Sequence, residues 1–160
     1  MDKRETVVSW LRDAHAMEAA AVSNLERNID RFKDYPTVQQ KFREDLEQTR
    51  THVRDLEQCL DQLGADRSAL KDMAMKFTGV VQPYITAMSR DEALKHLLAA
   101  NAYENFEVAC YQSLLAAAEE AGVPQVKAVA ERSLRQKKEM ADWINQQVPV
   151  VTRDYLRRVQ

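Results

Sequence analysis

Residues 91–124 read DEALKHLLAANAYENFEVACYQSLLAAAEEAGVP, and this stretch indicates the fold more clearly than the rest of the chain. It has neither glycine nor proline before Gly122, and apolar residues occupy almost every side of the helix it predicts. Gly122 and Pro124 together form a signal that ends one helix and starts the next. A long helix that is apolar all round needs other helices around it, so the stretch predicts a helical bundle.

Glycine and proline residues elsewhere divide the chain into further helical segments, among them Pro36, Gly64 and Pro149. We expect one domain over residues 1–160, with four long helices and a crossover that contains a helix of its own. The expected helices cover about 5–33, 37–63, 91–121 and 125–147, with the crossover at 66–90 and a short tail helix at about 150–158. Two tight hairpins joined by one long crossover give an all-α, ferritin-like antiparallel four-helix bundle.

The composition excludes several classes of function. The chain has 160 residues, with 23 basic and 25 acidic residues and a net charge of −2. This balance gives no electrostatic basis for binding nucleic acid or an anionic membrane. Cys59 and Cys110 lie inside helical patterns without metal-site spacing, which indicates small core residues in a reducing compartment. No apolar run reaches membrane length, so we expect a cytoplasmic protein.

Polar and charged residues interrupt the apolar stripe of each long helix at positions that should face the bundle interior. One such charge commonly extends to water or caps a neighbour, but four helices that each carry one favour a buried cluster. Isolated buried charges are costly unless they are paired or bound to metal. The residues are Glu18, Asp45, His52, Glu104, Glu107 and Lys137, with Gln48 at the edge of the second stripe.

The positions of these residues along the helices predict that most of them meet in one layer. Glu18 and His52 each lie about 17 residues from the first hairpin, or roughly 25 Å at the rise of an α-helix. The candidates on the third and fourth helices lie about 15–18 residues from the second hairpin, at a comparable level. Asp45 should lie about 10 Å from this layer along the second helix.

Four blocks of the sequence resemble the YciE/YciF family of bacterial ferritin-like proteins, and they are closest to YciE. The blocks are Trp10–Glu18, Tyr103–Tyr111, Ser113–Ala118 and Met140–Trp143, and the resemblance extends over nearly the whole chain. It implies a cytoplasmic homodimer that is associated with the stress response, without an established reaction. The wider superfamily holds di-iron centres between glutamates and Glu-x-x-His motifs of facing helices.

The resemblance can be carried over to individual site residues. The match is incomplete, because some ligand positions of the relatives hold other residue types in this chain. Glu18, Glu104 and Glu107 match the carboxylates of the first and third helices. Relatives have Glu-Thr where this chain has Gln48-Thr49, and Glu-Glu-Lys where it has a Gln-Lys-Lys run that includes Lys137. No Glu-x-x-His motif occurs in the chain. Tight binding of two iron ions is therefore in doubt, because hard cations need several carboxylate oxygens.

Two functional interpretations remain open, and they also leave open whether the protein is an enzyme. In the first, Glu18, His52, Glu104 and Glu107 hold iron or another divalent metal, and the protein is a metal-dependent oxidoreductase that handles oxygen or peroxide. In the second, Lys137 replaces the metal, no cofactor is bound, and the protein has a structural or interaction role. The lysine favours this partly degenerate site, because a protonated ammonium is a poor metal ligand.

The near-uniform apolarity of the third helix also predicts a homodimer, in agreement with the resemblance. An unknown protein partner would transmit any role in a stress pathway. Crossover residues would either cover the third helix or contribute to the dimer interface; the candidates are Met73, Phe77, Val80 and Val81.

Overall fold

The computed structural model describes residues 1–75, 77, 79 and 82–159, without the side chains of residues 82 and 84. Four long helices make up most of it, and two short helices lie in the crossover. The helices are α1 (Lys3–Asn28), α2 (Pro36–Gln62), α3 (Leu70–Met75), α4 (Gln82–Ala87), α5 (Glu92–Ala121) and α6 (Pro124–Arg158), and a 3-10 helix, η1 (Ile29–Phe32), follows α1.

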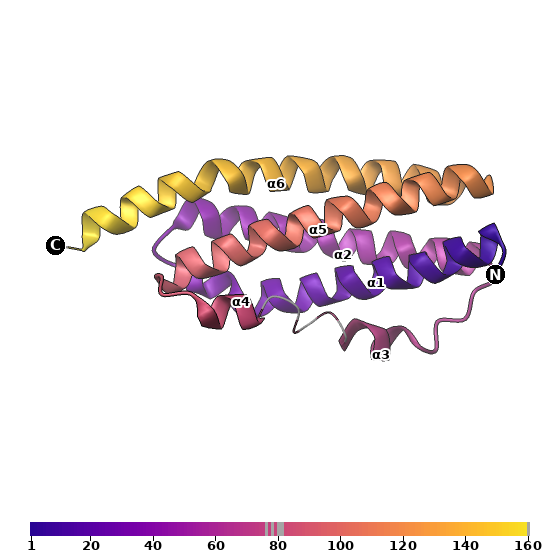
Figure 1. The fold of residues 1–160 in the computed structure, drawn as a ribbon, viewed down its shortest axis with the longest axis horizontal. Helices are drawn as coiled ribbons and strands as arrows, with labels where there is room; N and C mark the ends of the chain where they lie inside the picture. The colour runs from indigo at the N-terminus through magenta and orange to yellow at the C-terminus, as the bar shows by residue number, and fades with distance from the viewer. Residues whose placement is uncertain (76, 78, 80–81, 160) are drawn as a thin grey trace.

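The four long helices form an antiparallel bundle, as the sequence predicted (Figure 1). Helices α1 and α2 form one hairpin and α5 and α6 form the other. In the crossover, α3 packs beside α1 and α4 packs beside α5. The described part of the chain contains no β-strand. None of its helices is both long enough and apolar enough to cross a lipid bilayer.

Helix ends are fixed by the local signals that the sequence carries. The Asp2 side chain accepts a hydrogen bond from the Glu5 backbone N–H, and the Glu5 carboxylate accepts one from Asp2, which completes a capping box at α1. The Asp91 side chain caps α5 by accepting from Leu94 N–H at 3.1 Å. Gly122 has φ +65°, in the left-handed region that favours glycine, and it ends α5 tightly enough for α6 to start at Pro124.

The separate tail helix at 150–158 was a wrong prediction, because α6 continues through Pro149 as one helix of 35 residues. Proline removes one backbone N–H and so leaves the Asn145 carbonyl without its helical partner. Asn145 and Pro149 are both exposed, so water can solvate that carbonyl. Val151 is 1 % exposed and belongs to the core, and its burial favours continuation of the helix.

Two further boundaries differ from the predicted ones. The first long helix ends its α-helical part at Asn28, and the turn up to Phe32 is a 3-10 helix. The crossover contains two short helices, α3 and α4, instead of one. Phe77 packs on α5, with its ring centroid 6.4 Å from that of Phe106, whereas Val80 and Val81 lie outside the described residues.

The apolar core is divided into two clusters. One lies toward the α5–α6 hairpin and includes Leu11, Leu60 and Leu114; the other lies toward the α1–α2 hairpin and includes Phe42 and Ile144. The buried polar residues therefore lie between these two apolar halves of the bundle.

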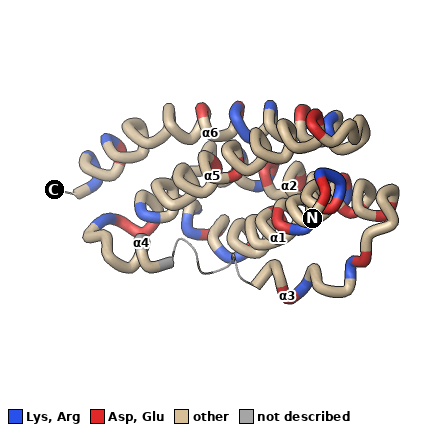
Figure 2. Tube along the Cα trace, turned by 45° about the vertical axis from the view of Figure 1, so that its right-hand side comes forward, with Lys and Arg blue, Asp and Glu red and all other residues tan. Residues whose placement is uncertain are grey.

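Charged positions on the long helices mix both signs along their length, without a face of one sign in the view of Figure 2.

Candidate functional site

Lys137 lies at the centre of the buried polar cluster. Its Nζ atom is 3.0 Å from Glu18 Oε2 and 2.7 Å from Glu107 Oε2, and it donates to Thr49 Oγ1 at 3.5 Å. The side chain of Lys137 is 1 % exposed and those of Glu18 and Glu107 are 0 % exposed. One ammonium on α6 thus connects residues of α1, α2 and α5.

One further hydrogen bond and one imidazole contact the Glu18 carboxylate on its other side. Tyr111 O–H donates to Glu18 Oε1 at 2.7 Å, and His52 Nδ1 lies 3.4 Å from the same oxygen. His52 Nε2 lies 2.6 Å from Gln136 Oε1, which accepts its hydrogen bond. Glu18 therefore has a fixed orientation, set by residues of α2, α5 and α6.

The electrostatics of the cluster favour an ionised Glu18 and a protonated Lys137. Burial alone raises the pKa of the Glu18 carboxyl, but Lys137, His52 and Tyr111 lower it to about 2. Burial alone lowers the pKa of the Lys137 ammonium, but the surrounding carboxylates, Glu107 and Glu18 foremost, raise it well above its usual value. The carboxylates around Lys137 therefore favour its charged form.

For the other carboxyl groups of the cluster, the effect of burial on the pKa outweighs the effect of the nearby positive charge. Burial raises the pKa of Glu104 and of Glu107 well above the usual value, against the lowering effect of Lys137. Burial likewise raises the pKa of Asp45, and Glu18 adds to that rise. One ammonium cannot balance four buried carboxylates, so part of the cluster retains protons.

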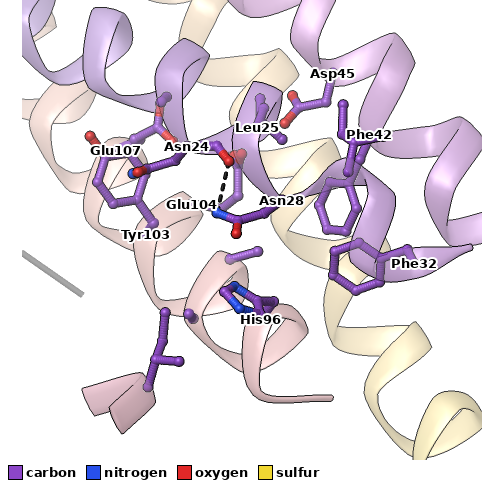
Figure 3. Close-up of a pocket in the computed structure, with 15 residues that line it drawn as sticks. Asn24, Leu25, Asn28, Phe32, Phe42, Asp45, His96, Tyr103, Glu104 and Glu107 are labelled. Atoms are coloured by element: carbon purple, nitrogen blue, oxygen red, sulfur yellow. Dashed lines mark hydrogen bonds between the residues drawn. The ribbon is translucent and has the colours of Figure 1, made fainter. Parts of the chain in front are cut away.

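A cavity of about 80 Å³ adjoins the acidic side of the cluster. Figure 3 shows Asp45 and Glu104 near one end of it and His96 near the other, with Phe32 and Phe42 along one side and Tyr103 and Glu107 along the opposite side. The dashed line in that view is the hydrogen bond from the Asn28 side-chain amide to the Asn24 carbonyl, at 2.8 Å. Carboxyl groups thus line one end and one side of the cavity, and the rings of Phe32 and Phe42 line the opposite side.

The structure brings together Glu18, His52, Glu107 and Lys137 from four helices. Glu104 and Asp45 are buried beside them, at 5 % and 4 % exposure. Gln48 is only half-buried, at the edge of the stripe where the sequence placed it.

The site residues predicted from the sequence do not include three groups that hold the cluster: the hydroxyls of Thr49 and Tyr111 and the amide of Gln136. Thr49 and Tyr111 lie on the inner stripes of their helices. Threonine and tyrosine are also common in apolar cores, so the sequence does not distinguish these two from ordinary core residues. Gln136 precedes Lys137 and lies at the same level of the bundle as His52. This shared level was the signal in the sequence that could have identified Gln136 as a partner of His52.

The residues present do not fit a di-iron centre. The Lys137 ammonium lies within ion-pair distance of the two carboxylates that would have to bind the metal, at 3.0 and 2.7 Å. A protonated amine has no lone pair for a metal. Among the described residues no group of three or more His, Cys, Asp and Glu side chains is placed so that it could hold an ion. The assignment of Glu18, His52, Glu104 and Glu107 as metal ligands stays a prediction.

A protein-family model described as a "Domain of unknown function (DUF892)" matches residues 2–157. The chain belongs to this family. Among solved structures, a protein from Xanthomonas campestris pv. campestris is 27 % identical to it with a TM-score of 0.82, and the match covers 98 % of each chain. The family membership and the fold support a relationship to YciE/YciF-like proteins.

Two more distant structures share the ferritin-like fold. YcfI from Rhodopseudomonas palustris, provisionally described as a structural protein, is 20 % identical with a TM-score of 0.74 over 91 % of this chain and 94 % of that chain. The E. coli stress protein YciF is 16 % identical with a TM-score of 0.76 over 92 % and 95 %. At such identities the likeness shows the fold alone, so function must be argued from the site.

Proposed function

We propose that this member of the family is a YciE-type, stress-associated protein whose di-iron-type site has become an internal ion-pair cluster, and that it acts as a structural or interaction protein. The observation that carries the proposal is the position of Lys137 Nζ, 3.0 Å from Glu18 and 2.7 Å from Glu107. In this cluster the ammonium supplies the positive charge that a metal supplies in a carboxylate bundle.

The assembly that we propose is a homodimer. An exposed stripe on α5 supports it, because its residues recur at intervals of four and three and so lie on one face of the helix. Phe106, 41 % exposed, lies on this stripe, and Trp10 on α1 is 40 % exposed. The stripe consists of Ala102, Phe106, Ala109, Ser113 and Ala116. The association with stress is supported by the resemblance and by the fold shared with YciF, and the cytoplasmic location stays a prediction.

A metal-dependent oxidoreductase is the second candidate, and unpaired carboxyl oxygens favour it. Glu107 Oε1 has no hydrogen-bond partner among the described residues, and the carboxyl groups of Asp45 and Glu104 have only each other. A metal ion beside these oxygens would neutralise them and supply redox or Lewis-acid chemistry. Lys137 would then have to lie to one side of the metal.

Metal analysis separates the two candidates. Protein purified without a chelator and without a metal-affinity step should contain far less than one iron or manganese ion per chain. The variant Lys137→Glu combined with Gln48→Glu should bind manganese during refolding and gain thermal stability with added metal. The exposed Lys138→Glu serves as the control and should show no gain. Stoichiometric metal held by the central carboxylates of the wild type would overturn the proposal.

A further inference from the structure

A surface hollow of about 660 Å³ adjoins the cavity, and the proposed function leaves it unused. Residues of α1, η1, α4 and α5 line this hollow, and it shares Asn24, Asn28, Ile85 and His96 with the cavity of Figure 3. Sites for small molecules commonly have volumes of roughly 300–1,000 Å³. The hollow is therefore large enough for a small ligand, and its charge indicates which kind.

The hollow carries an excess of positive charge. Its described lining contains three cationic side chains, Arg27, Arg31 and Lys95, and one acidic side chain, Glu92. Glu92 is shared between two of them, because its carboxylate oxygens lie 3.2 Å from Arg31 Nη1 and 3.4 Å from Lys95 Nζ. Arg27 precedes Arg31 by about one helical turn, so the three cations converge. Three positive charges against one negative charge leave an excess of two.

Neighbouring asparagines hold the two guanidinium groups without neutralising them. Arg27 Nη2 donates to Asn24 Oδ1 at 2.9 Å, and Arg31 Nε donates to Asn28 Oδ1 at 3.0 Å. In the described part of the chain Arg27 forms no ion pair, since its other hydrogen bond goes to the backbone carbonyl of Ser23. Arg27 Nη1 and Arg31 Nη2 have no acceptor among the described residues. Each fixed guanidinium group can therefore donate to a ligand in the hollow.

The inner side of the hollow is only partly hydrated. The side chains of Lys95 and His96 are 18 % and 9 % exposed. Burial is the largest cause that lowers the pKa of His96, and Arg31 and Lys95 lower it further against the raising effect of Glu92. The cations thus outweigh the carboxylate at this position. An anion here would be attracted more strongly than on an open surface, because less water screens the charges.

We propose that the hollow binds a dianionic phosphate group, as free phosphate or as a phosphate monoester, through the guanidinium groups of Arg27 and Arg31 and the ammonium group of Lys95. The two negative charges of such a group match the excess of positive charge. Its oxygens match the N–H donors of guanidinium groups in geometry. A phosphodiester carries one negative charge and should bind less well. This site requires no metal and no change in the buried cluster.

Calorimetric titration of the full chain at constant ionic strength tests the proposal. The probes are inorganic phosphate, methyl phosphate and dimethyl phosphate, at about pH 7.5, where the first two are mainly dianions. We expect saturable binding of one inorganic phosphate or one methyl phosphate per chain, and about tenfold weaker binding of the singly charged dimethyl phosphate. Tighter binding of methyl phosphate than of inorganic phosphate would identify a monoester as the source, and the reverse would identify free phosphate; both support the proposal.

Matched variants separate a local site from a general effect of charge. Arg27→Gln breaks no ion pair of the described chain and should weaken methyl phosphate binding about tenfold, the strength of a charged hydrogen bond. Arg43→Gln removes the same charge from the exposed side of α2, outside the hollow, and should bind as the wild type does. Glu92→Gln removes the one acidic group of the described lining and should bind methyl phosphate more tightly.

Four results would each overturn the proposal. Neither inorganic phosphate nor methyl phosphate binds saturably at millimolar concentration, or dimethyl phosphate binds as tightly as methyl phosphate. Arg27→Gln and Arg43→Gln bind methyl phosphate alike, which would indicate attraction by the overall charge of the protein. Glu92→Gln binds methyl phosphate more weakly than the wild type does.

Discussion

The ammonium of Lys137 on α6 reaches the Glu18 carboxylate on α1 across the diagonal of the bundle, at 3.0 Å. In the described chain α1 and α6 are not in backbone contact, because each packs against α2 and α5. The pair therefore connects opposite corners through the middle of the core. This arrangement makes the lysine important for stability as well as for the chemistry of the site.

Replacing Lys137 with methionine should destabilise the protein strongly. Methionine preserves much of the apolar stem but leaves Glu18 and Glu107 without their positive partner. Breaking a buried ion pair in this way costs about 3–5 kcal/mol. Urea unfolding measures the loss, with the exposed Lys138→Met as the control. Equal stability of the two variants would contradict a structural role for the Lys137 charge.

Replacing Glu18 with alanine should be comparably destabilising, by about 3–5 kcal/mol, because Lys137 and the Tyr111 hydroxyl then lose their common partner. Thermal and urea unfolding measure the effect. The matched control on α1 is Glu26→Ala, which removes an exposed pair with Arg50 and should cost about 1 kcal/mol at most. A Glu18→Ala variant that melts within a degree or two of wild type would disprove this role.

Glu104→Gln should change how stability depends on pH. The pKa of Glu104 is raised in the folded state above its ordinary value of 4.5, foremost by burial, so the folded protein binds a proton that the unfolded chain releases. This contribution to stability is complete below pH 4.5 and is lost as pH rises toward the folded pKa. The neutral amide has no such proton, so the variant should gain stability relative to wild type as pH rises above 4.5.

Urea unfolding at several pH values measures this difference. Glu119→Gln on the exposed side of α5 is the control and should follow the wild-type curve. A Glu104→Gln curve parallel to that of the wild type over the whole range would show that Glu104 is ionised in the folded protein.

A charge on the α5 stripe should dissociate the proposed homodimer. Ala109 lies at the middle of the stripe and is exposed, so Ala109→Glu places a carboxylate in the interface without changing the described core of the monomer. Sedimentation velocity at micromolar concentration should show a dimer for wild type and a monomer for the variant. Arg135→Glu, exposed on α6, should stay dimeric. A wild type that sediments as a monomer would refute the dimer itself.

The sequence by itself determined the helices, their order and the polar positions that face inward. Each depends on local signals: the capping residues Asp2 and Asp91, the left-handed Gly122, and apolar residues at helical spacing. The common level of Glu18, His52, Glu107 and Lys137 also follows from counting residues along rigid helices away from each hairpin. Pro149 shows the limit of such signals, since the buried Val151 favours a continuous helix where the local rule predicts a break.

Only the tertiary structure decided how the buried groups share their charges and where empty space remains. Whether Lys137 reaches Glu18 or extends to water depends on side-chain directions across a bundle diagonal, which no helical period specifies. The cavity beside Asp45 and Glu104 likewise results from how α1, α2 and α5 fit together around Phe32 and Phe42. Periodicity places a residue on a face, whereas the partner of that residue is set by packing among helices distant in sequence.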